Sequence, residues 1–503
     1  MARPTPRPTR PETDEERTFR WALWSVFLIT VARLLWLALD RTDLYPDEAQ
    51  YWVWAQHLDW GYFSKPPMVA WLIAVSTRIF GNTGPGVRML SPLLHFATAM
   101  TIYSCARLLY DYRTAFWSAL TYAALPGVTV SATIMSTDAP LLLCWAVALY
   151  AFLRARAGAD RRWWVVVGVA IGLGLLSKYA MAYWLLCAFL FVGLWRDERR
   201  HLPMLLGATA LGLLIYAPNF LWNFANNFVS YRHTESNAAL GGPLIHPRSL
   251  LEFFGAQFGV FGPLLFSALI ALMVLAGRTL SDRRAQLLTC FTLPPLVLML
   301  ALSLLSRAQP NWAGPSYVAA TILVVAWLLA SGRRIIIIVS LALHLVAALL
   351  VAVGLRNIAA VAGVNLPARY DPLNRLQGWR TLGRAVSAEL AQHPGATLMA
   401  DNRELLAALM FYVEPHPFDA LEWDPNGVHD QFELSQRPAF DVGGDFLLVS
   451  QNRENIGPIL ARFKEVGPPQ AITVFTGRRG AVASPAEQRH YAVYFLRGFK
   501  GFP

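Results

Sequence analysis

Charge is scarce in this sequence of 503 residues. Only 15% of the residues are Asp, Glu, Lys or Arg, whereas a soluble domain averages about 25%. Hydrophobic residues make up 55% of the chain. This balance excludes a disordered chain, a collagen-like fibre and an ordinary soluble enzyme, and it is typical of a polytopic membrane protein.

Cysteine is also scarce, and several common motifs are missing. The four cysteines lie in apolar segments without metal-ligand spacing, which excludes a disulfide framework and a zinc ribbon. The chain has no GxGxxG sequence, no nucleophile elbow and no phosphate-binding loop. The net charge of +11 does not indicate nucleic-acid binding, because the position of the charges has a better explanation in the membrane topology.

What the sequence has in quantity is long apolar segments. A helix needs about 20 apolar residues to cross a bilayer. Eleven segments are near this length: 20–40, 86–109, 113–131, 137–154, 162–177, 179–195, 202–221, 256–277, 285–305, 311–331 and 335–354. The first follows a polar stretch and has no cleavage site after it, so we interpret it as an anchor helix. The sequence therefore predicts a polytopic α-helical membrane domain over 20–355, preceded by a cytoplasmic tail over 1–19.

The positions of arginine and lysine predict the orientation. With the N-terminus inside, the cytoplasmic segments hold 19 basic residues, and the longer external loops hold only 8. Eleven spans then place the C-terminal segment, 356–503, on the outer side of the membrane. This segment has no net charge, and its pattern predicts a small α/β domain. Helices are expected over 381–393 and 403–412, and strands over 396–400, 445–449, 471–475 and 491–496.

The first external loop, about 41–85, begins with the acidic pair Asp47-Glu48. Asp47 follows a proline and can cap a short helix that runs to about His57. We expect this aromatic helix to lie in the membrane plane. Its tryptophans and one that follows it, Trp52, Trp54 and Trp60, then belong to the interfacial aromatic belt. Asp47 by itself has two interpretations, a helix cap that interacts with the dipole or a functional carboxylate.

Other charged and polar residues fall on the same external side. They are Lys65 before two prolines, Asp138 at the start of the fourth apolar segment, Lys178 in a tight turn, and Arg307 with Gln309 and Asn311 between the ninth and tenth segments. Two of these residues also have a structural interpretation. Lys65 is then a lysine that extends its ammonium group to the membrane surface, and Asp138 is then a helix cap. Together, carboxylates and cations suit sugar transfer from a lipid phosphate. A carboxylate takes the proton of the acceptor hydroxyl, and cations stabilise the departing phosphate.

These motifs resemble those of the C-type (GT-C) membrane glycosyltransferases. The similarity is greatest to the bacterial relatives of protein O-mannosyltransferase and lipid A aminoarabinose transferase. The matching motifs, in order, are Pro46-Asp47-Glu48-Ala49, Tyr62-Phe63-Ser64-Lys65-Pro66-Pro67, Ser136-Thr137-Asp138-Ala139-Pro140, Leu176-Ser177-Lys178-Tyr179 and Gln309-Pro310-Asn311-Trp312. The segment from Ala400 to Tyr412 is similar to the soluble C-terminal part of these proteins.

The resemblance implies a GT-C fold and a reaction. The donor would be a polyprenyl-phosphate-linked sugar, and the sugar would be transferred with inversion to an extracytoplasmic acceptor. Lipid A, another envelope lipid or a glycan is favoured over a protein as that acceptor. The implied catalytic residues are Asp47 as the base, Lys65 and Asp138. The implied substrate-binding residues are Glu48, Tyr62, Lys178, Arg307, Gln309 and Asn311.

One departure from the family concerns metal binding. In the aminoarabinose transferases the residue before the Lys-Pro pair is acidic and can help to bind a divalent metal, whereas this chain has Ser64. The resemblance therefore does not support a metal or aminoarabinose as the sugar, and no cofactor is assigned.

Two other functions fit a protein of this composition. A transporter or flippase of lipid-linked sugar would need charges at mid-depth in several helices, and Arg33 is the main candidate. A scaffold that only presents the C-terminal domain predicts no effect of Asp47→Asn. No nucleic-acid partner is expected for any of these functions.

Overall fold

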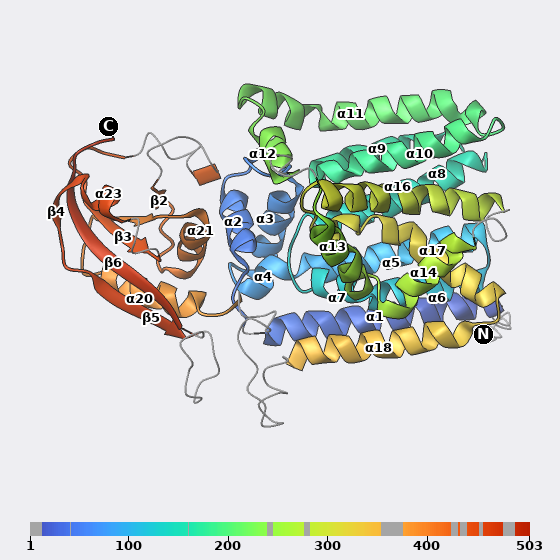
Figure 1. The fold of residues 1–503 in the computed structure, drawn as a ribbon, viewed down its shortest axis with the longest axis horizontal. Helices are drawn as coiled ribbons and strands as arrows, with labels where there is room; N and C mark the ends of the chain where they lie inside the picture. The colour runs from blue at the N-terminus through green and yellow to red at the C-terminus, as the bar shows by residue number, and fades with distance from the viewer. Residues whose placement is uncertain are drawn as a thin grey trace, which may run out of the picture.

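A computed structural model of the chain describes residues 13–40, 42–158, 160–238, 245–275, 282–353, 376–423, 431–432, 440–451, 456–475 and 488–502. Long helices run side by side through most of the molecule, and a small sheet with its own helices stands at one end of them (Figure 1). The helices α2, α3 and α4 of the first loop lie between these two parts (Figure 1).

The long helices form the membrane part of the protein. They and the shorter helices between them are α1 (Asp14–Leu39), α5 (Leu90–Leu109), α6 (Tyr112–Ala124), α7 (Pro126–Ser131), α8 (Asp138–Arg156), α9 (Arg162–Ser177), α10 (Ala182–Leu194), α11 (Leu202–Ala225), α12 (Val229–Ala238), α13 (Pro247–Val260), α14 (Pro263–Val274), α16 (Arg283–Leu305), α17 (Ser316–Ala330) and α18 (Arg334–Val353). Short 3-10 turns join some of them: η1 (Tyr179–Met181), η2 (Arg199–His201) and η3 (Pro310–Ala313).

Fewer helices are long enough to span a bilayer alone than the sequence suggests. Within the described ranges, α1, α8, α11 with the turn before it, and α16 meet the length and apolarity needed, and the bent pair α13–α14 is a fifth candidate. Five other apolar helices are shorter. The number of eleven spans therefore stays a prediction.

Two of the predicted segments are interrupted. Pro126 starts α7 within the segment 113–131. The segment 256–277 bends by 115° between α13 and α14. Gly262 stands at this bend with φ 92°, and a Cβ there would lie 2.0 Å from Nε2 of His344. Only glycine fits both the backbone conformation and the space.

The helices of the first loop are α2 (Pro46–Gln56), α3 (Met68–Phe80) and α4 (Gly84–Arg88). That the helix after Asp47 lies in the membrane plane stays a prediction, but its aromatic side chains do not face outward. Nearly every residue of α2 is buried, including Trp52 and Trp54, because α3 packs on one side and the C-terminal domain on the other. Of the three tryptophans assigned to the aromatic belt, only Trp60 is exposed.

The C-terminal part has the predicted α/β character. Its elements are α20 (Trp379–Leu390), β1 (Thr397–Ala400), α21 (Arg403–Tyr412), β2 (Leu421–Glu422), β3 (Phe446–Ser450), α23 (Gly457–Leu460), β4 (Phe463–Val466), β5 (Gln470–Phe475) and β6 (Gln488–Phe499). The six strands of this described part are ordered β2-β1-β3-β6-β4, with β5 also paired to β6. The pairs β1–β2 and β1–β3 are parallel, and every pair with β6 is antiparallel. The predicted helices and strands are confirmed, and β2 and β4 were not foreseen.

Alternate residues of β3 enter different cores, as expected for a strand with period two. Leu447 and Val449 face a core shared with α20, α21, α2 and α3, and Leu448 faces a second core on the other side of the sheet. Because one hydrophobic core joins the first loop to the C-terminal domain, this domain is packed onto the membrane part and does not hang from a linker. Trp52 is central, with its ring 4.9 Å from that of Phe411.

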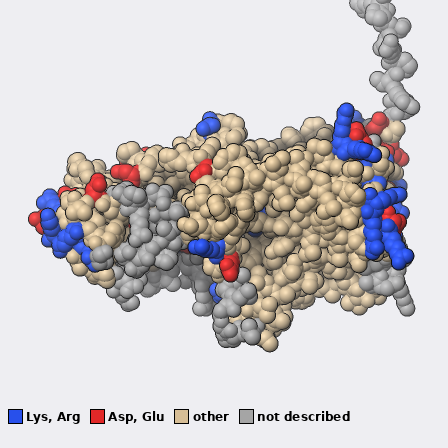
Figure 2. Space-filling view, turned by 90° about the horizontal axis from the view of Figure 1, so that it is seen from above, with Lys and Arg blue, Asp and Glu red and all other residues tan. Residues whose placement is uncertain are grey.

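Charged side chains gather at the ends of the molecule. The helical part shows few charges along its middle and a basic group at the end where α1 begins (Figure 2). Arg33, the residue that suggested a transport pathway, donates to the carbonyl of Ala123 at 2.6 Å and to the hydroxyl of Thr129 at 3.0 Å. Its guanidinium therefore has a structural use within the bundle.

Candidate active site

Asp47 lies in the first turn of α2, at the end of the bundle that carries the C-terminal domain. Pro46 occupies the start of this helix, where its missing N–H leaves no donor unpaired. The side chain of Asp47 is 41% exposed, and its Oδ1 lies 3.0 Å from Nη1 of Arg403. The same guanidinium also donates to Oε1 of Gln50, one helical turn further along α2. The carboxylate is thus accessible and held in one direction.

Glu48 has a different environment from its neighbour. Its side chain is buried, and Oε2 lies 2.7 Å from Nη2 of Arg88. The backbone amides of Tyr45 and Met135 donate to its two oxygens at 3.0 and 2.9 Å. The expected role in substrate binding finds no support here, because every side of the carboxylate has a partner within the fold. The ion pair instead fixes the start of α2, and with it Asp47.

Arg88 stands at the centre of this buried network. Besides Glu48, its guanidinium donates to the carbonyl of Asp43 at 2.9 Å and lies 3.3 Å from the carboxylate of Asp40. A buried charge of this kind is stable only while its partners remain.

A second group brings together three residues from distant parts of the chain. Oδ1 of Asp138 accepts from Nζ of Lys178 at 2.6 Å, and its Oδ2 accepts from Nδ2 of Asn311 at 2.7 Å. Asp138 begins α8, Lys178 ends α9, and Asn311 lies in η3. Both oxygens of Asp138 are therefore occupied, so this residue is suited to position Lys178 and η3.

Lys65 lies between these two groups. Within the described ranges, no hydrogen bond or ion pair holds its ammonium group. Burial lowers the pKa of Lys65 from 10.5, and the charge of Lys178 lowers it further, while Asp47 and Asp138 act in the opposite direction. These influences place the charges of Lys178, Asp47, Asp138 and Arg403 near that of Lys65. Among the described residues, two carboxylates there accompany three cations, Lys65, Lys178 and Arg403, and this balance suits an anionic ligand.

The remaining predicted site residues lie outside this group. Tyr62 is buried and stacks on Trp54 with ring centroids 4.5 Å apart, and its hydroxyl donates to backbone carbonyls of the same loop. Arg307 and Gln309 are exposed near η3. In the described part of the chain, neither side chain contacts Asp47 or Asp138.

Arg403 was not foreseen as a site residue. It is the first residue of α21, and Asn402 caps this helix by accepting from the amide of Leu405 at 3.0 Å. The cap sequence predicts where the helix starts, but nothing local indicates that its first side chain reaches a residue 356 positions earlier. Only the docking of the C-terminal domain on α2 reveals this contact.

The described residues contain no group of three or more His, Cys, Asp or Glu side chains that could hold a metal ion. Ser64 stands beside Lys65 in the loop before α3. We therefore assign no metal to the site, as in the sequence analysis.

Comparison with known proteins agrees with this architecture. Residues 64–222 match the family model described as dolichyl-phosphate-mannose-protein mannosyltransferase. The lipid A galacturonosyltransferase RgtD of Rhizobium johnstonii is 32% identical over 440 residues, which cover 86% of this chain and 91% of that protein. The undecaprenyl phosphate-alpha-4-amino-4-deoxy-L-arabinose arabinosyl transferase of Pseudomonas paraeruginosa is 30% identical over 213 residues, 38% of each chain.

Solved structures share the fold. ArnT of Cupriavidus metallidurans bound to undecaprenyl phosphate superposes with a TM-score of 0.62 at 18% identity, over 94% of this chain and 98% of that one. The same protein in the apo state gives a TM-score of 0.58.

The fold and the matches define the class as the C-type membrane glycosyltransferases, multi-pass proteins with apolar helices, here with a small C-terminal sheet. Within that class, this chain belongs to the family of membrane glycosyltransferases that includes RgtD. The predictions of a glycosyltransferase and of a polyprenyl-phosphate-linked donor are confirmed by these relatives.

Proposed function

We propose that this protein transfers an acidic sugar from a polyprenyl phosphate carrier to lipid A on the periplasmic side of the inner membrane. The observation that carries the proposal is the position of Asp47 beside Lys65, Lys178 and Arg403, at the end of the bundle where the C-terminal domain packs. A carboxylate beside an excess of cations suits a reaction that removes a proton from one substrate and produces a phosphate anion from the other.

In this mechanism the hydroxyl oxygen of the acceptor attacks the anomeric carbon of the lipid-linked sugar from the side opposite the phosphate, with inversion. Asp47 takes the proton of that hydroxyl. The bond between the anomeric carbon and the phosphate oxygen breaks, and its electron pair leaves with the polyprenyl phosphate. Lys65 and Lys178 stabilise the extra negative charge on the phosphate.

The other residues of the site act through these. Asp138 and Asn311 position Lys178, since Asp138 holds both groups by its two oxygens. Arg403 and Gln50 fix the direction of the Asp47 carboxylate. Glu48 and Tyr62 maintain the shape of the loop. Arg307 and Gln309, exposed at the rim, are placed to meet acceptor or donor during approach.

The nature of the sugar follows from charge. The relative that is similar over most of its length transfers galacturonic acid, whereas the aminoarabinose transferases handle a cationic sugar. This chain has the neutral Ser64 beside Lys65, and three cations face two carboxylates. An excess of positive charge favours a sugar with a carboxylate over one with an amino group.

The arrangement of charges supports the proposed orientation. Arginine-rich turns such as Arg283-Arg284 and Arg333-Arg334 lie at the ends of helices opposite the C-terminal domain. With the positive end in the cytoplasm, the Asp47 site faces the periplasm.

Mass spectrometry of whole envelope glycolipids tests the proposal. Strains carry the wild-type gene, Asp47→Asn or the control Glu404→Gln at matched protein level. Glu404 is an exposed acid one residue from Arg403. We expect Asp47→Asn to remove one hexuronic acid from lipid A and to accumulate its precursor, and Glu404→Gln to change nothing.

Three results would contradict parts of this proposal. Unchanged lipid A in the Asp47→Asn strain would exclude either the acceptor or the role of Asp47. Loss of an amino sugar in place of a uronic acid would exclude the argument from charge. Loss of sugar from glycoprotein alone would exclude lipid A.

A further inference from the structure

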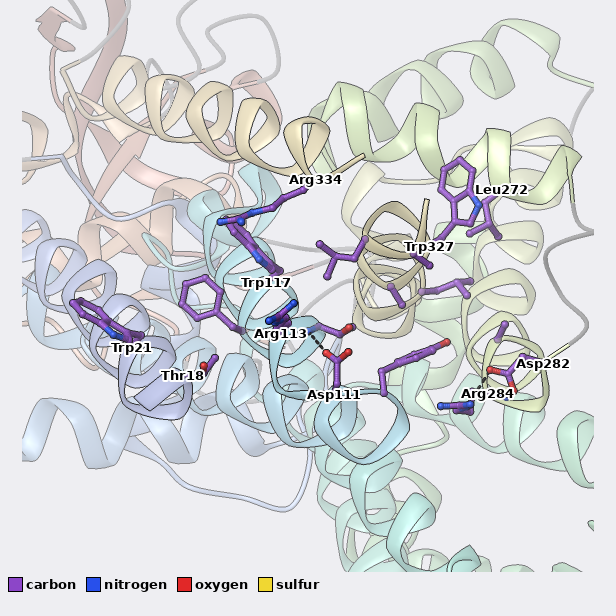
Figure 3. A pocket seen from close by; sticks show the side chains of 18 residues that line it. Thr18, Trp21, Asp111, Arg113, Trp117, Leu272, Asp282, Arg284, Trp327 and Arg334 are labelled. Atoms are coloured by element: carbon purple, nitrogen blue, oxygen red, sulfur yellow. Dashed lines mark hydrogen bonds and ion pairs between the residues drawn. The ribbon is translucent and has the colours of Figure 1, made fainter. Parts of the chain in front are cut away.

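A large cavity lies at the end of the bundle opposite Asp47. Its volume is about 1010 Å³. The ends of α1, α6, α14, α16, α17 and α18 surround it, together with the turn between α5 and α6. Figure 3 shows arginine and tryptophan side chains from several of these helices around the same space. The transfer reaction does not use it, because the whole length of the bundle separates it from the Asp47 site (Figure 1).

Three guanidinium groups line this cavity, and two of them have no acidic partner among the residues that the structure describes. Nε of Arg284 lies 3.0 Å from the carboxylate of Asp282. In the described part of the chain, neither Arg113 nor Arg334 has a carboxylate within ion-pair distance. The remaining acid, Asp111, caps α6 by accepting from the amide of Thr114 at 2.7 Å.

Each of these two exposed arginines lies near an aromatic ring. The guanidinium of Arg334 lies over the ring of Trp117, 4.8 Å from its centroid, and that of Arg113 lies 5.9 Å from the ring centroid of Tyr112. Such stacking orders a guanidinium without neutralising it. The cavity thus presents two ordered positive charges to any anion that enters.

The same cavity has apolar walls. Leu272, Leu323 and Phe116 line it, and Trp21 and Trp327 stand on different helices around it. Tryptophan is enriched where the hydrocarbon of a bilayer meets its headgroups. A ligand that fits must therefore be amphiphilic, with an anionic head for the arginines and an alkyl part for the apolar walls.

We propose that this cavity binds an anionic phospholipid, with the lipid phosphate between Arg113 and Arg334. A free phosphate compound would not use the apolar walls, and a neutral lipid would leave the two arginines without a partner. The site lies at the end of the bundle opposite the reaction. A lipid bound there would contact the ends of several helices and would take no part in sugar transfer.

Phosphatidylglycerol binding to the purified full-length protein tests this proposal. The variant is Arg113→Gln with Arg334→Gln. The matched control is Arg161→Gln with Arg162→Gln, which removes two exposed arginines from the start of α9 at the same end of the bundle. Each basic residue near an anionic membrane surface contributes about fivefold to binding, so the variant should bind about thirtyfold more weakly. The control should stay within about twofold of the wild type.

Native mass spectrometry after delipidation, with phosphatidylglycerol or phosphatidylcholine added back, gives the measurement. We expect the wild-type protein to retain phosphatidylglycerol in preference to phosphatidylcholine. Ala330→Trp provides a second variant that changes no charge. Ala330 is exposed on the cavity wall, so the larger side chain should occupy the space and also weaken retention.

Several outcomes would overturn the proposal. Equal retention by the wild-type protein and by the Arg113, Arg334 and Ala330 variants would show that lipid binds elsewhere. An equal loss in the Arg161 and Arg162 control would show attraction to the basic surface only. Competition by soluble glycerol phosphate at equal strength would show that the ligand is a free phosphate compound and not a lipid.

Discussion

The contact between Arg403 and Asp47 links the C-terminal domain to the proposed chemistry, and its removal separates two roles for that domain. In Arg403→Ala, the Asp47 carboxylate loses the group that holds its Oδ1 at 3.0 Å. The two side chains are 33% and 41% exposed. A pair this accessible contributes about 1 kcal/mol or less to the free energy of unfolding. The domain itself should stay docked, because the hydrophobic core around Trp52 and Phe411 is untouched.

The effect on catalysis should be much larger. A general base acts only when it is aimed at the proton that it accepts, and a displacement of about 1 Å can reduce the rate about 100-fold. We therefore expect kcat of Arg403→Ala to fall by about 10- to 100-fold. Arg403→Lys keeps the charge but not the planar group that reaches both Asp47 and Gln50, so it should recover only part of the rate.

Arg380→Ala is the control. Arg380 also joins the C-terminal domain to the first loop, with Nε 3.6 Å from the carboxylate of Asp43, but it does not contact Asp47. The assay is transfer of sugar from the lipid-linked donor to lipid A by purified protein, with thermal melting in the same detergent. An equal loss of rate in both variants, or a loss in Arg403→Ala that follows only its melting temperature, would refute the positioning role.

Two further predictions concern Glu48 and Lys65. Glu48→Gln removes the closest carboxylate from the buried charge of Arg88 and leaves only Asp40, at 3.3 Å, so it should lower the free energy of unfolding by about 3 kcal/mol. Glu252→Gln in the exposed Arg248–Glu252 pair should change it by less than about 0.5 kcal/mol, and equal shifts in thermal melting would contradict this. Burial lowers the pKa of Lys65, so its ammonium loses its proton at a lower pH than that of a free lysine, and kcat/KM should decline on the alkaline side below the usual lysine range. Lys65→Arg keeps its charge and should move that decline to higher pH, and an unchanged profile would exclude Lys65 as the titrating group.

Much of the fold follows from local patterns. The apolar segments indicated the membrane helices. The short apolar runs at β1 and β3 and the helical pattern at α21 indicated the α/β character of the C-terminal part. Breaks within apolar segments were harder to predict. The bend at Gly262 depends on the close approach of His344 from α18, which no local pattern contains.

The candidate site could be predicted from the sequence only in part. Asp47, Lys65, Asp138 and Lys178 stand out because charge is rare in such a chain and membrane-embedded charge is costly. Their neighbours decide what each can do. Glu48 has the same charge as Asp47 and is adjacent to it, yet its carboxylate is buried against Arg88.

The sequence alone therefore determined the class of protein, the apolar helices and the loops that carry the charged residues. It could do so because composition and order along the chain are local properties. Tertiary structure decided that α2 is buried against α3 and the C-terminal domain, that Arg403 reaches Asp47 across 356 positions, and that Arg113 and Arg334 line one cavity. These outcomes depend on which distant surfaces pack together, and that choice is made by the shared cores of the folded chain.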